Sequence, residues 1–272
     1  MISFPKAKIN FGLSILEKRP DGFHDIETIF YPIPLSDALE FVVLPGKGKE
    51  DELVITGINI RTRPEKNLVI RAVKRLRTGY PVPPLKIHLH KAIPAGAGLG
   101  GGSSDAARIL RSINKCFRFA ITETDLKNIA LELGSDCPFF LNPVPSLGTG
   151  RGEVLKPVAP MLEGYHVVLL NPGILISTKE AYHNCRPAQR EPGLEQLASS
   201  PASSWKKLIV NDFEDFVFKV YPQVEELKRT LYRSGAVYSS MTGSGSTVYG
   251  IYQDKPKITP KMKDYLVYEG IL

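Results

Sequence analysis

The chain has 272 residues, 43% of them hydrophobic, which is enough for one large globular domain or two modest ones. Its net charge of +7 suits an anionic substrate or nucleic acid, but the basic residues are scattered. No apolar run approaches the roughly 20 residues of a membrane span, and charges interrupt the N-terminal segment, so we expect neither a membrane protein nor a signal peptide. The three cysteines are odd in number and lack metal-ligand spacing, which is typical of a reduced, cytoplasmic protein.

The first half of the chain is predicted to be rich in strands. Alternating apolar residues and proline punctuation indicate strands over residues 2–16, 26–31, 38–44, 53–60 and 85–90. Helical spacing indicates helices over residues 67–77, 106–115 and 123–133. Thr122 is the expected N-cap of the last of these helices, and Gly134 is its expected end.

The second half mixes strands and helices. We expect a strand over 165–170, a mobile surface loop over 186–204, helices over 213–218 and 224–231, strands over 237–241 and 246–252, and a terminal element over 266–271. A strand-rich half followed by a mixed half predicts an α+β fold. We place the boundary between the two domains so that they span residues 1–155 and 156–272.

A glycine-rich loop is the most informative stretch of the chain. Residues 94–107 read PAGAGLGGGSSDAA and lie between a predicted strand and a predicted helix. Glycines let backbone N–H groups approach an anion, and the start of a helix adds unpaired donors. The stretch has no lysine, so it is not a Walker A loop, and its match to the dinucleotide-binding fingerprint is weak on its own. The pattern predicts a site for a nucleotide polyphosphate.

Four separated segments together resemble one enzyme superfamily. They are the glycine loop, Pro5–Phe11 (PKAKINF), Arg19–His24 (RPDGFH) and Met241–Ser246 (MTGSGS). The chain is similar to the GHMP kinase superfamily nearly from end to end. The resemblance implies a two-domain GHMP kinase fold, with an N-terminal domain like domain 2 of ribosomal protein S5 and a C-terminal ferredoxin-like α/β sandwich.

The segments around Lys8 and Phe23, with Gly134–Phe139 (GSDCPF), resemble one branch of that superfamily. The branch implies ATP-dependent phosphorylation of the 2-hydroxyl of 4-diphosphocytidyl-2-C-methyl-D-erythritol, in the non-mevalonate route to isoprenoid precursors. It further implies ATP and Mg²⁺ as cofactors and a small-molecule substrate linked to cytidine diphosphate. We expect a cytoplasmic monomer or homodimer that binds neither nucleic acid nor membrane.

The resemblance also assigns roles to residues of this chain. Asp136 matches the catalytic aspartate that accepts the hydroxyl proton, and Lys8 matches the lysine that pairs with it and steadies the moving charge. The positions matching ATP contacts are Asn67, Lys91, Pro94, Gly96, Gly98, Leu99, Gly100, Gly101, Gly102, Ser103 and Ser104. Either Ser103 or Ser104 would ligate Mg²⁺. Because like charges repel, Asp105 is expected to be a first-turn acid that faces away from the phosphates, with a metal role as the alternative.

The substrate side is predicted from an aromatic–histidine pair. Phe23 and Tyr182 are expected to form the two walls of a cytosine slot, with His24 on the edge of the base. Phe23 departs from the tyrosine common at this position, so stacking is kept and a hydroxyl contact is lost. The other positions assigned to the substrate are Asn10, Phe30, Tyr31, Thr178, Gly243 and Gly245.

Two alternatives stay open at this stage. One is another GHMP kinase, of the homoserine, mevalonate or galactose type, for which the aromatic–histidine pair would have no purpose. The other is a basic RNA-binding protein, which the net charge of +7 permits. That alternative leaves Lys8, Asp136 and the glycine loop without a role.

Overall fold

The computed structural model describes residues 1–46, 50–60 and 64–272. The chain forms two compact units, each assembled from separate segments. Unit 1 comprises Met1–Ala7, Leu35–Ala95 and Gly100–Pro143, and unit 2 comprises Lys8–Pro34, Gly96–Leu99 and Val144–Leu272. These units are not contiguous halves of the sequence, and the division at residue 155 stays a prediction.

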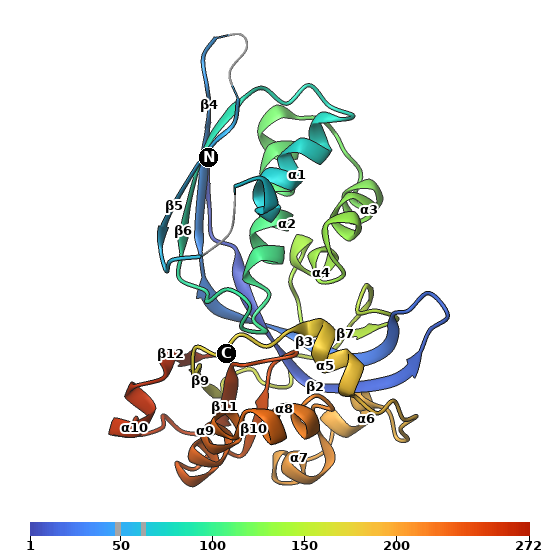
Figure 1. The fold of residues 1–272 in the computed structure, drawn as a ribbon, viewed down its shortest axis with the longest axis vertical. Helices are drawn as coiled ribbons and strands as arrows, with labels where there is room; N and C mark the ends of the chain where they lie inside the picture. Colours follow the sequence, from blue (N-terminus) through green and yellow to red (C-terminus); the bar gives the residue numbers. More distant parts are fainter. Residues whose placement is uncertain (47–49, 61–63) are drawn as a thin grey trace. The chain divides into compact units, whose positions relative to one another are not determined.

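Unit 1 packs helices against one face of a four-stranded sheet. The strand order is β1-β4-β6-β5, with β4 antiparallel and β5 parallel to β6. The strands are β1 (Ile2–Ser3), β4 (Ala38–Val43), β5 (Glu52–Gly57) and β6 (Leu85–Lys91). The helices are η1 (Pro64–Lys66), α1 (Leu68–Arg77), α2 (Gly101–Phe117), α3 (Glu123–Leu133) and α4 (Cys137–Leu141). Helices α1 to α4 lie on the same side of the sheet (Figure 1).

Side-chain alternation along β6 explains this packing. Leu85, Ile87 and Leu89 are buried, whereas Lys86 and His90 are exposed. Successive residues of a strand point to opposite faces, so one face of the sheet is apolar and requires a cover. On α1, Val69, Ile70, Ala72, Val73 and Leu76 are buried. The predicted amphipathic helix over 67–77 is confirmed.

Helix α2 begins earlier than the sequence predicts. It starts at Gly101 rather than near residue 106, and its N-cap Gly100 has φ 71°. Glycines have low helix propensity, so the pattern conceals the first turn. Gly101 is nevertheless needed there, because a Cβ on it would lie 2.8 Å from Ile93 Cγ2. The glycine loop is therefore shorter than expected, and Ser103 to Asp105 belong to the helix.

Unit 2 contains two further four-stranded sheets, ordered β2-β3-β7-β8 and β10-β11-β9-β12. The strands of the first are β2 (Lys6–Lys18), β3 (His24–Ser36), β7 (Ser146–Thr149) and β8 (Val154–Pro157). Those of the second are β9 (His166–Leu170), β10 (Tyr238–Met241), β11 (Val248–Tyr252) and β12 (Leu266–Ile271). The helices are α5 (Thr178–Asn184), α6 (Leu194–Ala198), α7 (Ala202–Leu208), α8 (Glu214–Val220), α9 (Pro222–Arg233) and α10 (Pro260–Lys263). A core that includes Val168, Val217, Leu227 and Val248 joins sheet and helices.

The expectation of a mobile loop over 186–204 is wrong for its second half. Helix α6 lies there and buries Leu194, and α7 begins at Ala202 and buries Trp205. Helices of five and seven residues are too short for their periodicity to stand out in a polar stretch. The side chain of Leu194 packs against Gly12. A Cβ on Gly12 would lie 2.6 Å from Leu194 Cδ1, so a larger residue would collide with it.

Other short elements were not predicted, among them α4, α5, α10, β7 and β8. The strand predicted over 2–16 is divided near Pro5 into β1 and β2, because proline lacks the N–H that a ladder requires. Within the described ranges, no helix is long and apolar enough to cross a membrane.

Candidate active site

The first turn of α2 carries predicted phosphate-binding residues of unit 1. The N–H groups of Gly101, Gly102 and Ser103 precede the first helical hydrogen bond, which Ser104 N donates to Gly100 O at 2.9 Å. A Cβ on Gly102 would meet only Leu68, at 3.5 Å. The backbone N–H groups at this helix start and the helix dipole together suit an anion at this turn.

The two serines of this turn differ in access. Ser104 is buried, with 3% of its surface exposed, whereas Ser103 is half-buried. Ser103 is hydrogen-bonded to the thiol of Cys137, and burial raises the pKa of that thiol to about 11 against the effect of this bond. Cys137 is therefore a neutral structural group. Ser103 is the better placed of the two predicted serine ligands.

A buried charge cluster joins the end of β6 to the start of α2. Lys91 Nζ donates to a carboxylate oxygen of Asp37 and, at 2.7 Å, to Asp105 Oδ2. Asp37 also accepts hydrogen bonds from Ala92 N at 2.6 Å and from Ile93 N at 2.8 Å. Asp37 is fully buried, and Asp105 and Lys91 are 2% and 3% exposed. The cluster thus fixes the chain directly before and directly after the glycine loop.

Protonation balances the charges of this cluster. Burial raises the pKa of Asp105 to about 7, although the charge of Lys91 opposes the rise. Burial also disfavours the charged form of Lys91, but Asp105 and Asp37 outweigh it, so the pKa of Lys91 is raised on balance. The charge of Asp37 and a hydrogen bond with it also raise the pKa of Asp105, and Asp105 Oδ1 is buried without a hydrogen-bond partner within the described chain.

This geometry corrects two expectations. Lys91 follows Leu85, Ile87 and Leu89 on the inner face of β6, so its ammonium enters the protein and contacts carboxylates there. Asp105 lies beyond the first turn of α2 and is a buried partner of that ammonium, rather than a first-turn acid. A role of Lys91 toward ATP would have to use its backbone.

Two further predicted residues of unit 1 sit at helix starts. Asn67 is 7% exposed and caps α1, with its Oδ1 accepting a hydrogen bond from Val69 N at 2.9 Å. Asp136 is half-buried and occupies the N-cap position of α4, directly before Cys137 and Pro138. The preceding turn is held by the bond from Cys137 N to Gly134 O, at 3.0 Å. The Asp136 carboxylate is therefore carried by a short, well-defined connection between α3 and α4.

Lys8 and Asn10 form a second buried polar group, in unit 2. Lys8 is 3% exposed, and its Nζ donates to Asn10 Oδ1 at 2.5 Å and to Gly98 O at 2.8 Å. Asn10 Nδ2 donates to Thr28 Oγ1 at 2.9 Å. The Lys8 ammonium also lies 5.5 Å from the centre of the Phe30 ring. The structure thus brings together Lys8, Asn10 and Gly98, which the sequence analysis assigned to catalysis, to the substrate and to ATP.

The second glycine turn meets the same group. Thr242 Oγ1 donates to Gly98 O at 3.0 Å and accepts a hydrogen bond from Asn10 N at 3.0 Å. Gly243 and Gly245 have φ values of 56° and 93°, and the Ser244 between them shares a hydrogen bond with Thr178, Oγ to Oγ1, at 3.0 Å. Thr178 therefore lies beside the turn, as expected if both contact one substrate. Thr242 stands in the quoted motif, but the sequence analysis did not single it out.

Gly98 is predicted to tolerate no side chain. Its φ is +76°, and a Cβ would lie 1.9 Å from Thr242 O. We expect Gly98→Ala to cost about 1–2 kcal/mol for the left-handed backbone and about 1–3 kcal/mol more for overpacking. Gly164→Ala is the control, since Gly164 has φ +82° with nothing within 4 Å. Urea unfolding of both variants measures the difference, and equal losses would refute the close approach to Thr242.

The aromatic side chains of unit 2 are arranged differently from the prediction. His24 stacks on Tyr182, with ring centres 5.0 Å apart, whereas Phe23 is 51% exposed and lies beneath the guanidinium of Arg151 at 4.6 Å. Neighbours in an extended chain point to opposite sides, so Phe23 and His24 do not share a face. His24 rather than Phe23 therefore contacts Tyr182. Arg151, which the sequence analysis missed, stands in the glycine-rich stretch 148–152.

The electrostatics of His24 suit a stacking role. Burial lowers the pKa of His24, and the charge of Lys18 lowers it further. The ring is therefore neutral at pH 7, with one nitrogen donating and one accepting. Tyr182 is held from behind by an edge-on contact with Phe213, at 4.9 Å between ring centres.

Phe30 and Tyr31 are neighbours in β3, so their side chains point to opposite faces of the sheet. Phe30 is 1% exposed. Its ring packs against Gly148, on which a Cβ would lie only 2.5 Å from the ring. Tyr31 is 4% exposed, burial raises the pKa of its hydroxyl, and this hydroxyl is hydrogen-bonded to the backbone of Leu162. Phe30 lies with Lys8, and Tyr31 has a structural position on the other side of β3.

Comparison with known proteins identifies the family of this chain. The family model for the GHMP kinases N terminal domain matches residues 67–142, and the model for the GHMP kinases C terminal domain matches residues 193–264. A solved structure of a 4-(cytidine 5'-diphospho)-2C-methyl-D-erythritol kinase superposes with a TM-score of 0.78 at 32% identity, over 92% of this chain and 90% of that one. The predicted α+β GHMP kinase fold is confirmed.

Two bacterial relatives match over almost their whole length. The chain is 47% identical to the 4-diphosphocytidyl-2-C-methyl-D-erythritol kinase of Parabacteroides distasonis, over 100% of both chains. It is 46% identical to the protein of the same name from Bacteroides thetaiotaomicron, over 93% of this chain and 92% of that one. The chain belongs to the GHMP kinase family, in its branch of 4-diphosphocytidyl-2-C-methyl-D-erythritol kinases.

Proposed function

We propose that this protein transfers the γ-phosphoryl group of ATP to the 2-hydroxyl of 4-diphosphocytidyl-2-C-methyl-D-erythritol. The observation that carries the proposal is the match over the whole chain to a kinase named for that substrate. It favours this substrate over the homoserine, mevalonate and galactose alternatives. The reaction would take place in the cytoplasm on small molecules, with the protein acting as a monomer or a homodimer.

The first turn of α2 supports the assignment of the ATP phosphates to unit 1. The free N–H groups of residues 101–103 suit phosphate oxygens, and Ser103 adds a hydroxyl. Among the described residues, no cluster of three His, Cys, Asp or Glu could hold a metal ion. The family pattern assigns Mg²⁺ to Ser103 or Ser104 together with nucleotide oxygens, where it would supply neutralisation of phosphate charge.

Phosphoryl transfer depends chiefly on positioning and on charge stabilisation. Asp136 is the proposed acceptor of the proton of the substrate hydroxyl. Lys8 is the proposed cation that stabilises charge on the transferred group, and its buried contacts with Asn10 and Gly98 hold it without rotational freedom. These two roles come from the family pattern and are open to direct mutational test.

The substrate is proposed to lie on unit 2. His24 and Tyr182 offer a neutral stacking pair for the cytosine, and Phe23 with Arg151 offers a second aromatic and cationic contact. Thr178, Asn10 and the turn of Gly243 and Gly245 would contact the diphosphate or the polyol. The positive φ of Gly243 and Gly245 shapes this turn, and Ser244 between them adds a hydroxyl beside Thr178.

A coupled assay of ADP release tests the proposed reaction. Purified protein with MgATP is given 4-diphosphocytidyl-2-C-methyl-D-erythritol, with mevalonate, homoserine and galactose in parallel. We expect ADP release with the cytidylylated substrate alone. Turnover of another alcohol with silence on this one would keep the GHMP family and reject the substrate.

His24→Ala is expected to weaken the cytidylylated substrate selectively. Loss of base–aromatic stacking costs about 1–3 kcal/mol, which would appear as a higher KM for this substrate. The KM for ATP should stay unchanged, because the nucleotide is assigned to α2. His183→Ala is the control, since His183 is exposed on α5 next to Tyr182. Steady-state kinetics with each substrate varied in turn decides, and equal weakening of both substrates would reject the role of His24.

A further inference from the structure

Two buried polar side chains, one shortly before α8 and one in its first turn, form hydrogen bonds with β10 and with the second glycine turn that follows it. Asn211 is 2% exposed, and its Nδ2 donates to Met241 O at 2.8 Å and to Gly243 O at 2.9 Å. Glu214 is 7% exposed, and its Oε1 accepts hydrogen bonds from Met241 N at 2.7 Å and Ser240 Oγ at 3.0 Å. Met241 is therefore held through both its N–H and its C=O.

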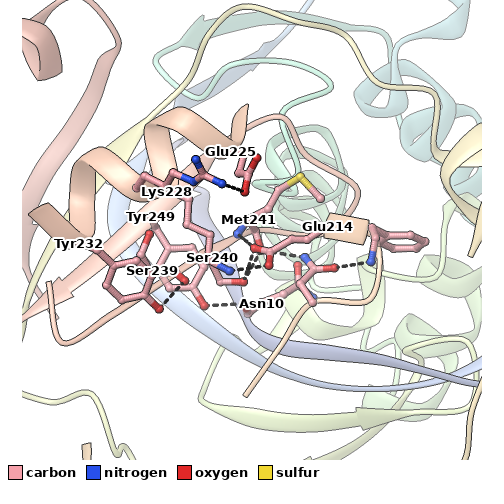
Figure 2. Close-up of polar contacts among 12 residues, drawn as sticks. Asn10, Glu214, Glu225, Lys228, Tyr232, Ser239, Ser240, Met241 and Tyr249 are labelled. Atoms are coloured by element: carbon pink, nitrogen blue, oxygen red, sulfur yellow. Dashed lines mark hydrogen bonds and ion pairs between the residues drawn. The ribbon is translucent and has the colours of Figure 1, made fainter. Parts of the chain in front are cut away.

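Asn211 and Glu214 are themselves held. Asn211 Oδ1 accepts a hydrogen bond from Phe213 N at 3.0 Å, so both ends of its amide are used. Glu214 Oε2 accepts a hydrogen bond from Lys228 Nζ at 2.5 Å, which pairs the buried carboxylate with a cation from α9. Figure 2 shows Glu214 between Lys228 and the backbone of Met241. A satisfied buried network of this kind has one low-energy arrangement.

The second glycine turn connects this network to Lys8, Asn10 and Gly98 by hydrogen bonds. Thr242 lies between the two carbonyls that Asn211 holds, and its hydroxyl contacts Gly98 O and Asn10 N. Gly98 O and Asn10 Oδ1 are in turn acceptors for the Lys8 ammonium. Asn10 is held from a second direction by Tyr249, whose hydroxyl donates to Asn10 O at 2.8 Å, as Figure 2 shows.

From these contacts we infer that Asn211 is a positioning residue for phosphoryl transfer, acting through Thr242 on the group of Lys8, Asn10 and Gly98. The inference rests on the proposed function. Only an amide fits the position, because it offers two N–H donors to two carbonyls and one acceptor to an N–H. Asp at 211 would keep the shape and set a carboxylate oxygen against both carbonyls.

The test is Asn211→Asp in the full-length protein. Small misplacements of catalytic groups can cost about a hundredfold in rate, so we expect kcat to fall by about that factor while the KM for ATP stays near that of the wild type. Thr242→Val removes the hydroxyl that carries the coupling and should give the same kinetic change. The double variant should lose little beyond either single one, since both interrupt one path.

Asn114→Asp is the matched control. Asn114 likewise donates to a backbone C=O and accepts from a backbone N–H, both of Ile121 at 3.1 Å, but it lies in unit 1 on α2. It should lower the melting temperature and leave kcat unchanged. If Asn211→Asp lowers kcat no more than this control does, or raises both KM values at constant kcat, the positioning role is overturned.

A second readout needs no substrate. Thr242 N donates to Thr247 O, and Gly245 N donates to Thr242 O, so amide hydrogen exchange reports on the turn. Asn211→Asp, or Asn211→Ala if the aspartate variant does not fold, should speed exchange at these amides and in residues 8–10, and Asn114→Asp should not. Unchanged exchange would overturn the inference. If the wild type is inactive on the cytidylylated alcohol, the proposed function is refuted. The exchange result would still decide whether Asn211 positions the group of Lys8, Asn10 and Gly98.

Discussion

Replacing Asp136 by asparagine is expected to lower kcat by roughly 10²- to 10⁴-fold, the usual contribution of a general base. Asparagine has the same shape and keeps the N-cap position of α4, so the fold should be retained. It cannot accept the proton of the substrate hydroxyl, so kcat falls. The KM for ATP should change little, because ATP is assigned to α2 and not to Asp136. Steady-state kinetics with circular dichroism on the same preparation measures both effects.

Asp125→Asn provides the control for Asp136→Asn. Asp125 belongs to the same unit and pairs with the hydroxyl of Thr122, at 2.8 Å, in the cap of α3. Its replacement removes a carboxylate near a helix start, with no expected effect on kcat. Near-normal kcat in Asp136→Asn would show that the carboxylate at 136 does not accept the proton.

Replacing Asp37 by asparagine is expected to be the most destabilising of the conservative changes. Asp37 is fully buried and holds the Lys91 ammonium together with the N–H groups of Ala92 and Ile93. The amide would turn N–H donors toward the ammonium or toward these N–H groups. Breaking a buried ion pair on one side costs about 3–5 kcal/mol. Urea unfolding at pH 8 measures the loss.

Asp105→Asn tests the same cluster from its other carboxylate, with the opposite expectation. The pKa of Asp105 lies near 7 in the folded protein and near 3.8 when exposed, so the folded state holds the extra proton between these values. Stability from this group is therefore fully present below pH 3.8 and is lost as the pH rises from there through about 7. The asparagine variant lacks this loss, and its stability relative to the wild type should improve between pH 5 and pH 8. A loss at pH 8 as large as that of Asp37→Asn would contradict the charge balance described here.

The long periodic elements were predictable from the sequence, and the short ones were not. Helix α1 and strand β6 follow directly from apolar spacing, because each buries one face over at least seven residues. Helices α6 and α7 bury only a few side chains each, and a polar, proline-containing composition hid them. The start of α2 was missed because glycine opposes helix formation on average, whereas here Gly101 is required by the closeness of Ile93.

The candidate site was predictable where a motif names residues, and less so where geometry decides. Lys8 and Asn10 belong to the segment Pro5–Phe11 and Gly98 to the glycine loop, and the structure joins the two motifs by hydrogen bonds. Lys91 matches a nucleotide contact of the family, and its alternation with Leu85, Ile87 and Leu89 indicates an inward side chain, but its partner Asp37 is 54 residues away in the chain and has no local signal. Asn211 escaped notice because its partners are backbone carbonyls, which leave no pattern in the sequence.

The most direct test of the proposed reaction is the structure of its product. The wild type is incubated with MgATP and 4-diphosphocytidyl-2-C-methyl-D-erythritol, and phosphorus and carbon NMR spectra of the product are recorded. The account predicts one new phosphate monoester, coupled to carbon 2 of the methylerythritol, with the diphosphate link to cytidine intact. A phosphate on another hydroxyl, or ADP formed without any new ester, would contradict it.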